Sequence, residues 1–418
     1  MIKNRITYSN FSDWKFFVVQ AKGSLLWTKE GQRLIDFTSG WNVTNLGWNN
    51  EEIINAAQEQ LSFSSYVPMW SSCHIQEKYA NALTNALPTQ LSAIIRATGG
   101  TEANEVAIKL ARSYTGRKKI IGFKDTYHGQ SLTTMSIGFR PKDTKAIDPM
   151  VPKFIQMEYP YAQTKNIAEQ KDILDNFALS LEQLLKKSDV AGMILEPGMI
   201  TGWGSCGIAP IGFLQKVREL TKKYGVIMIL DEVGTGFSRI GSLFGFQLYN
   251  VIPDVITFAK GSCNGVGGIG TVVSAKNIIE PTISKANYTS TFGWSPVSCA
   301  AALKTLELHI KHKTWKESQV KGKTIIKKIK NSIKRYTDSV KVFGIGMEIG
   351  INFIDTNNKS KEEIAQDVAN KAFKKGLHIV DSGEGNIQIM PPINIEPELL
   401  QEGLEILNES ILDVVEKL

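Results

Sequence analysis

Residues 225–236 read GVIMILDEVGTG, an apolar run that ends in two carboxylates and continues into glycines. Five consecutive apolar side chains, Val226–Leu230, are typical of a strand that is covered on both faces. Other apolar runs and helical patterns alternate around it, with strands predicted at 119–123, 190–195, 225–230 and 255–258 and helices at 101–114, 179–187 and 212–223. This alternation predicts an α/β fold in which helices cover a mostly parallel sheet.

The two ends of the chain depart from this alternation. Residues 23–37 predict a hairpin and residues 50–61 a helix. Beyond Pro296 the patterns predict two long helices, short strands at 347–353 and 386–390, and a closing helix from Pro397. We therefore expect a large domain over 60–295 and a small α+β domain assembled from 1–59 and 296–418, within the two or three domains that 418 residues allow.

The charge of the chain is concentrated in one segment. The net charge is +7, and residues 311–335 hold ten Lys or Arg against one acid. Isoleucines at helical spacing in this segment indicate one buried face and a solvated basic back. A composition of 42% apolar and 21% charged residues is typical of a globular protein. We therefore expect no nucleic-acid partner.

Cysteine usage and hydropathy predict a cytoplasmic protein. The four cysteines are widely spaced, which favours reduced thiols. Residues 1–20 hold no apolar leader, and no run is long enough to span a bilayer.

Three loops at predicted strand ends or helix starts carry unusual residues. In the first, Gly99-Gly100-Thr101-Glu102 opens a predicted helix. Glycines permit close approach of the backbone, and the free N–H groups of a helix N-terminus suit a phosphate. A simple helix cap at Thr101 is the alternative.

The other two loops follow buried strands. Asp231 and Glu232 close the strand quoted above, where unpaired carboxylates are costly; a salt-bridged pair or a metal site would explain them, although further metal ligands are not near in the sequence. Lys260 follows strand 255–258 and precedes Gly261, which is typical of a desolvated amine that forms a Schiff base. A lysine that reaches solvent at a sheet edge is the alternative.

Together the three loops predict one site for an aromatic aldehyde cofactor that carries a phosphate. The first loop would hold the phosphate, Asp231 would face a pyridine nitrogen, and Lys260 would bind the aldehyde.

The chain resembles the class III (omega) aminotransferases, which are pyridoxal-phosphate enzymes of fold type I with a seven-stranded type of sheet. The matching motifs occur in the family's order along nearly the whole chain: 39–47, 99–105, 127–129, 195–197, 230–241, 253–254, 259–261, 291–293 and 391–392. The resemblance implies that Lys260 holds the cofactor as a Schiff base, that Asp231 pairs with the pyridine nitrogen, and that Glu196 lies near the ring substituents. It implies cofactor contacts from six further residues: Gly100 and Thr101 on the phosphate, Tyr127 and Val233 on the two ring faces, His128 beside them, and Thr291. It also implies a homodimer in which Thr291 reaches the partner's site.

Two departures from the family pattern concern the substrate. Members that use glutamate or 2-oxoglutarate often have a second glutamate five residues after the first, where this chain has Thr201. They also carry an arginine shortly before Pro-Pro, whereas residues 378–390 contain none. Asp381 in that stretch would repel a carboxylate. We therefore expect an amine, amino alcohol or amino sugar among the substrates.

Other residues fall where family members line the substrate pocket. Trp41, Asn42, Trp70 and Trp203 would suit a ring-bearing or apolar substrate, with core packing as an equal interpretation. Arg140 would hold a substrate carboxylate unless it is a surface residue.

The expected reaction moves an amino group from a primary amine to a keto or aldehyde acceptor by ping-pong chemistry. An aminomutase or a racemase would use the same scaffold and would need no second substrate. A non-catalytic protein without cofactor is the alternative from another class.

Overall fold

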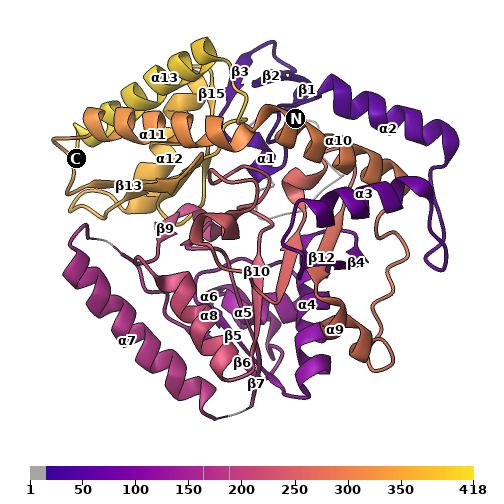
Figure 1. The fold of residues 1–418 in the computed structure, drawn as a ribbon. Helices are drawn as coiled ribbons and strands as arrows, with labels where there is room; N and C mark the ends of the chain where they lie inside the picture. The colour runs from indigo at the N-terminus through magenta and orange to yellow at the C-terminus, as the bar shows by residue number, and fades with distance from the viewer. Residues whose placement is uncertain (1–15, 163, 188) are drawn as a thin grey trace.

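The computed structural model describes residues 16–162, 164–187 and 189–418 (Figure 1). Its central sheet has seven strands in the order β4-β12-β11-β10-β7-β5-β6. Their bounds are β4 (Ala93–Ala97), β12 (Gly270–Ser274), β11 (Val255–Phe258), β10 (Ile227–Asp231), β7 (Val190–Leu195), β5 (Lys119–Phe123) and β6 (Phe154–Met157). The five strands from β11 to β6 are parallel, and β12 is antiparallel to both of its neighbours. The predicted mostly parallel sheet is confirmed.

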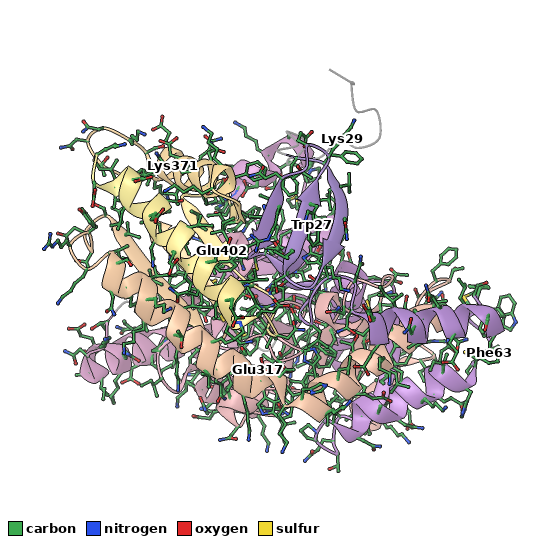
Figure 2. The ribbon with its side chains drawn as sticks, turned by 90° about the horizontal axis from the view of Figure 1, so that it is seen from above. Trp27, Lys29, Phe63, Glu317, Lys371 and Glu402 are labelled. Atoms are coloured by element: carbon green, nitrogen blue, oxygen red, sulfur yellow. The ribbon has the colours of Figure 1, made fainter. Side chains whose placement is uncertain are left out.

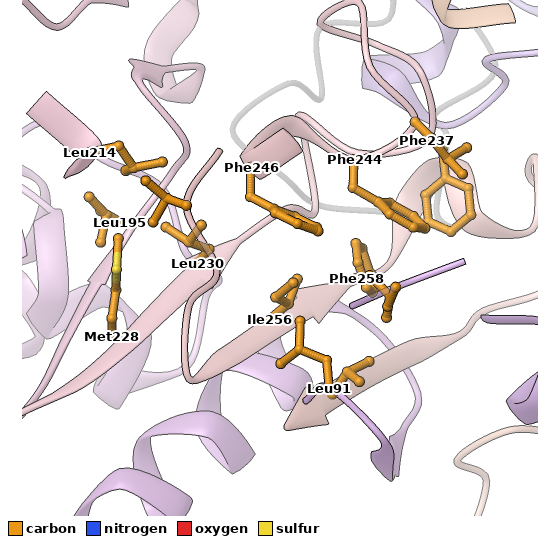
Figure 3. Packing of buried hydrophobic residues seen from close by; sticks show 14 of the residues in the cluster. Leu91, Leu195, Leu214, Met228, Leu230, Phe237, Phe244, Phe246, Ile256 and Phe258 are labelled. Atoms are coloured by element: carbon orange, nitrogen blue, oxygen red, sulfur yellow. The ribbon is translucent and has the colours of Figure 1, made fainter. Parts of the chain in front are cut away.

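Strand β10 sends alternate side chains to opposite faces of this sheet. Met228 and Leu230 belong to one hydrophobic core, which also holds Phe258 (Figure 3), whereas Ile227 and Ile229 belong to a second core. Every residue of β7, β10 and β11 is buried. The strand quoted at the outset is therefore covered on both faces.

Helices cover the two faces. Helix α4 (Gly100–Thr115) packs Val106, Ala107 and Leu110 into the core around Ile229. The opposite face is covered by α2 (Glu51–Phe63), α3 (His74–Asn85), α7 (Ile167–Leu185), α8 (Phe213–Lys223) and α10 (Pro296–His312). The helix predicted at 179–187 is the last part of α7, whose first residue, Ile167, is 74% exposed, so that no apolar stripe marks the start of the helix.

Both chain ends contribute to a second body. The C-terminal sheet has the order β13 (Val340–Ile345), β14 (Glu348–Phe353), β17 (Asn386–Ile389) and β16 (Val380–Asp381). The N-terminal sheet joins β1 (Val18–Lys22), β2 (Leu25–Thr28) and β3 (Arg33–Asp36) to β15 (Leu377–His378), and β15 pairs in parallel with β3. Helices α11 (Thr314–Ser332), α12 (Lys361–Lys374) and α13 (Pro397–Val415) lie together at the upper left of Figure 1 and pack into the same core.

Figure 2 shows this body from above, with Trp27 of β2, Glu402 of α13 and Glu317 of α11 on it and Phe63 at the far end of α2.

The shorter elements are α1 (Ser39–Asn42), α5 (Leu132–Gly138), α6 (Pro141–Thr144), α9 (Lys276–Ile279), β8 (Met199–Ile200), β9 (Gly207–Ile208) and 3-10 turns at Lys145–Ile147, Gly202–Gly204, Gly245–Tyr249, Lys260–Ser262 and Glu280–Thr282. Within the described ranges, no helix combines the length and apolarity that crossing a membrane requires.

The predicted domain boundaries stay predictions. Cys299 and Leu306 of α10 pack into the core of the central sheet, although the boundary was expected at residue 296. Residues 1–15 of the predicted segment 1–59 lie outside the described residues.

Candidate active site

The carboxyl ends of three neighbouring parallel strands bring the predicted residues together. Glu196 follows β7, Asp231 closes β10, and Lys260 lies two residues beyond β11. The register pairs Leu195 with Leu230 and Asp231 with Thr257, so the three strands end at the same edge of the sheet. This edge is where the sequence places the site.

Asp231 is buried and held from three sides. Its Oδ2 accepts a hydrogen bond from Asn104 Nδ2 at 2.8 Å and lies 2.7 Å from His128 Nδ1. Its Oδ1 accepts from the Val233 amide at 2.9 Å. Asn104 is itself fixed, because its Oδ1 accepts from Thr257 Oγ1 at 2.7 Å. The carboxylate therefore has one orientation.

Asn104 is a site residue that the sequence argument did not single out. It lies three residues after Thr101 on α4, so one face of that helix carries both side chains. That spacing, with a polar residue in a largely apolar helix face, is the signal that would have found it.

Glu232 points away from Asp231, because consecutive residues of a strand face opposite sides. Its carboxylate accepts from the amides of Gly245 and Phe246, at 2.7 Å each, and from Thr235 Oγ1 at 2.9 Å. The two acids therefore form no shared site, and in the described ranges no three His, Cys, Asp or Glu side chains are grouped to hold a metal ion.

The start of α4 forms a cradle that is closely packed at Gly100 and Gly129. A Cβ on Gly100 would lie 3.0 Å from Val233 Cγ1, and one on Gly129 would lie 2.6 Å from Thr101 Oγ1. Within the described part of the chain, no side chain caps this helix at Gly99. Its first N–H groups are therefore available to an anion.

Tyr127 and His128 follow β5 and lie over the same region. The Tyr127 ring is 38% exposed, with its centroid 6.3 Å from that of Trp203. His128 is buried, and its Nε2 has no hydrogen-bond partner among the described residues. A ring with one half-exposed face and a histidine that orients Asp231 both suit an aromatic cofactor.

Glu196 is buried beside Thr201. The Thr201 amide donates to Glu196 Oε1 and Oε2 at 3.1 Å each, and Thr201 Oγ1 donates to Oε1. Burial raises the pKa of Glu196 to about 7, although the His128 and Thr201 contacts oppose this rise. Glu196 therefore changes charge near neutral pH.

This titration predicts a stability effect in protein stripped of cofactor. Folded Glu196 keeps its proton up to about pH 7, whereas the unfolded group loses it near 4.5, so the free energy of unfolding falls as pH rises through this window. The fall is expected to reach about 3 kcal/mol. Burial also raises the pKa of Glu232 to about 7, so Glu232 contributes a similar fall. Denaturant titrations at pH 5 and pH 8 should therefore show a smaller fall in Glu196→Gln than in wild type, while exposed Glu405→Gln keeps the wild-type fall. An equal fall in wild type and Glu196→Gln would contradict the assignment.

Arg140 is neither free nor a simple surface residue. Its two Nη atoms donate to the two carboxylate oxygens of Glu384, each at 2.6 Å, and its Nε donates to Asp143 at 2.9 Å. The guanidinium carbon lies 5.1 Å from the centre of the Trp203 ring. Arg140 thus lies beside a predicted pocket residue, but a carboxylate already occupies it.

The predicted place of Asp381 in the pocket needs correction. Asp381 pairs with Ile387, and directly paired residues point to the same face of a sheet. Ile387 is buried in the core under that sheet, whereas the adjacent Gln388 points the other way and donates to Thr201 O at 3.3 Å. Asp381 therefore faces away from Thr201.

A different acid, Glu348 of β14, lies on the Thr201 side of the sheet. Glu348 is fully buried, and its Oε2 accepts from Asn42 Nδ2 at 2.6 Å. The sequence argument missed it; an acid at the start of the otherwise apolar strand predicted at 347–353 was the available signal. Asn42, predicted to line the pocket, is thus engaged with Glu348.

The other predicted residues lie farther out. Trp70 is 81% exposed, and Thr291 is exposed next to Phe292, whose ring centroid is 5.9 Å from that of Tyr66. Trp41 is half-buried with a backbone φ of 69°. Within one chain, Trp70 and Thr291 face solvent.

These residues fit pyridoxal phosphate. The uncapped helix start suits its phosphate, the fixed Asp231 carboxylate suits a protonated ring nitrogen, and Lys260 supplies the amine. The fold and the site together define a pyridoxal-phosphate enzyme of fold type I.

Comparison with known proteins gives the family. A model of the aminotransferase class-III family matches residues 7–411, so the chain belongs to the class-III aminotransferases. It is 30% identical over 396 residues to acetylornithine aminotransferase of Listeria innocua, covering 95% of this chain and 94% of that protein. It is 29% identical over 401 residues to the alanine/serine racemase of Pyrococcus horikoshii, covering 92% and 83%.

A solved structure agrees with this assignment. The crystal structure of an (S)-enantioselective omega-transaminase from Thermomicrobium roseum has a TM-score of 0.90 at 26% identity, covering 99% of this chain and 96% of that one. Class-III aminotransferases depend on pyridoxal phosphate. The enzyme class, the fold type and the cofactor predicted from the sequence are confirmed, and the non-catalytic alternative is set aside.

Proposed function

We propose that this aminotransferase takes its amino group from a primary amine rather than from a dicarboxylic amino acid such as glutamate. One observation carries the proposal: Gln388 lies three residues before Pro391, in the stretch where members that bind carboxylates have an arginine, and its amide reaches Thr201 O. Thr201 itself stands where such members often have a second glutamate. The two neutral positions are thus in contact, and they leave Glu196 and Glu348 as the charges beside them.

The proposed roles of the chain's residues follow from their positions. Bound pyridoxal phosphate supplies an electron sink. Lys260 anchors it and moves the proton of the substrate carbon, while Asp231, oriented by His128, keeps the ring nitrogen protonated. The remaining proposed contacts are Gly100 and Thr101 with the phosphate, Tyr127 and Val233 with the ring faces, and Glu196 with the ring substituents.

The acceptor is proposed to be a small keto acid whose carboxylate binds Arg140. Glu384 must then release the guanidinium, which it holds through two charge-assisted hydrogen bonds. The Trp203 ring contacts the Arg140 guanidinium on one side and the Tyr127 ring on another.

The two half-reactions test this proposal separately. With pyruvate as acceptor, kcat/KM for the best amine is expected to exceed kcat/KM for glutamate by at least about 10-fold. The reason is that Gln388 stands where an arginine would bind the second carboxylate of glutamate. Arg140→Ala is expected to raise KM for pyruvate by about 10- to 100-fold and to leave the amine half-reaction unchanged.

Surface Arg335→Ala serves as the matched control for loss of an arginine. Glutamate that rivals the best amine would refute the donor class, and an unchanged KM for pyruvate in Arg140→Ala would refute the acceptor site.

We also propose a homodimer in which Thr291 reaches the partner's phosphate. The exposed aromatic side chains of Phe63, Tyr66, Trp70 and Phe292 support it, because large apolar patches mark interfaces. Phe63 projects at the edge of the molecule in Figure 2. Sedimentation equilibrium that gives the monomer mass at micromolar concentration would refute the dimer.

A racemase is the second candidate, favoured by the similarity to the Pyrococcus protein. A racemase keeps the amino group on its substrate. Interconversion of L- and D-alanine without any keto acid, and without release of pyruvate, would identify this activity in place of transfer.

A further inference from the structure

The C-terminal sheet presents a polar face to the active site. Along β14 and β17, Ile349, Ile351, Ile387 and Ile389 point into the core, so the residues between them point the other way. Glu348, Gly350 and Gln388 lie on that opposite face. A Cβ on Gly350 would lie 2.6 Å from Gly204 O, so this face packs directly on the 202–206 segment.

Glu348 is the one acid that β14 and β17 place on this face. Asn42 Nδ2 donates to its Oε2 at 2.6 Å, and Gln388 Nε2 donates to its Oε1. Cys206 Sγ lies 3.7 Å from Oε1. Burial raises the pKa of Glu348, while the charges of Arg239 and Lys260 act to lower it. Burial outweighs these opposing contacts, so the pKa of Glu348 lies above its usual range, and an ammonium bound beside it would favour the carboxylate form.

The Arg239 guanidinium, whose charge acts on Glu348, makes no direct hydrogen bond to it among the described residues. Arg239 is fully buried, and its Nη atoms donate to Pro391 O at 2.8 Å and to Asn45 Oδ1 at 2.6 Å, with longer contacts to Met347 O and Ser39 Oγ. In the described structure its hydrogen bonds thus go to neutral oxygens. With Asn42, Gln388 and Cys206 as its donors, Glu348 keeps one lone pair, on Oε2, for another donor.

The two residues that clamp Glu348 also present free acceptors. Asn42 and Gln388 are each 1% exposed, and their amide oxygens, Oδ1 and Oε1, have no hydrogen-bond partner within the described ranges. Their nitrogens face the carboxylate, so the oxygens must point elsewhere. The cluster therefore offers one carboxylate and two amide oxygens, all of which accept hydrogen bonds.

This cluster lies beside the reacting lysine. A Cβ on Gly261 would lie 3.3 Å from Asn42 O, so Asn42 packs against the turn that carries Lys260. On the other side, Gln388 donates to Thr201 O, and Thr201 contacts Glu196. Asn42 and Gln388 thus connect Glu348 to the Lys260 turn on one side and to the Thr201–Glu196 pair on the other.

We propose that Glu348, with Asn42 and Gln388, binds a second ammonium group on the amine donor, so that the preferred substrate is a diamine. The inference rests on the proposed amine-donor function and narrows it. An ammonium has three donors and no acceptor, so one of its N–H groups can donate to Glu348 Oε2, and its charge complements the buried carboxylate. A substrate carboxylate would face a like charge, and a hydroxyl would donate only one hydrogen bond and carry no charge.

Three amines of equal chain length test this assignment with pyruvate as acceptor: butylamine, 4-amino-1-butanol and 1,4-diaminobutane. In wild-type holoenzyme, kcat/KM for the diamine is expected to exceed that for butylamine by about 10- to 100-fold, as for a hydrogen bond between charged groups. Glu348→Gln is expected to remove this preference, so that kcat/KM for the diamine falls to within about 3-fold of kcat/KM for butylamine measured in the same variant. Reorientation of either clamping amide lets the new side chain fit. Glu402→Gln, on the outer face of α13 (Figure 2), is the matched control.

Each result decides between the claims. Equal losses for all three amines in Glu348→Gln, or a loss of the diamine preference in Asp381→Asn instead, would overturn the role of Glu348. A wild-type preference for the amino alcohol, or for butylamine, would overturn the diamine while the amine-donor function stands. If no amine reacts and glutamate does, the proposed function itself fails. If Glu348→Gln loses the cofactor absorbance, the variant cannot be compared. The test is then the wild-type ratio of kcat/KM for the diamine to kcat/KM for butylamine, and a ratio near one would overturn the diamine assignment.

Discussion

Lys260→Ala is expected to abolish amine transfer, with turnover reduced by at least about 10⁴-fold, because one residue both anchors the cofactor and moves the proton. The absorbance band above about 400 nm that marks cofactor bound to the lysine should disappear. Lys260→Arg keeps the positive charge but is not a nucleophile, so it should be as inactive as the alanine variant. Absorbance spectra and single-turnover reactions measure both effects.

The turn that carries Lys260 is closely packed. Lys260 has a backbone φ of 38°, and a Cβ on Gly261 would lie 2.6 Å from Asn45 Nδ2. The backbone is thus held in place by packing, so loss of the side chain should leave its path unchanged. Lys276→Ala, at the start of α9, is the control for loss of a lysine elsewhere. A band that persists in Lys260→Ala and vanishes in Lys276→Ala would show that the cofactor lysine was misassigned.

The central sheet could be predicted because its middle strands are unbroken apolar runs. Strands 119–123, 190–195 and 255–258 have the predicted bounds. Strands β4, β6 and β12, of four or five residues each, were not predicted. Once the parallel order was expected, the meeting of Glu196, Asp231 and Lys260 followed from their places at strand ends.

Side-chain direction in short strands could not be predicted in the same way. Asp381 and Gln388 lie in strands of two and four residues, and a shift of one residue exchanges the two faces of a sheet. The sequence therefore did not indicate that Asp381 faces away from Thr201, or that Glu348 lies on the Thr201 side of the sheet. Similarly, the sequence around Arg140 does not indicate its pairing with Glu384. That residue lies 244 positions away and contacts Arg140 only in the folded chain.

The Asp231 carboxylate is the group whose loss should reveal most about how the site is built. Asp231→Asn keeps the shape of the side chain, yet its amide cannot satisfy the surrounding donors. One oxygen position receives the Val233 amide, and the other receives Asn104 Nδ2. In either orientation the new NH₂ faces a donor, and Asn104 cannot turn to accept it, because Thr257 Oγ1 and His128 O fix its two ends.

Turnover in Asp231→Asn is therefore expected to fall by about 10²- to 10³-fold, as for loss of a preorganised charge. Cofactor affinity should fall as well, since the unsatisfied donor costs about 1–3 kcal/mol. Cofactor titration and kcat under saturating cofactor separate the two effects. Glu232→Gln is the matched control: it changes the adjacent acid, whose three hydrogen bonds lie on the other face, and should lower stability while kcat stays within about 3-fold. If Glu232→Gln lowers kcat as much as Asp231→Asn does, the ring acid is not Asp231 alone.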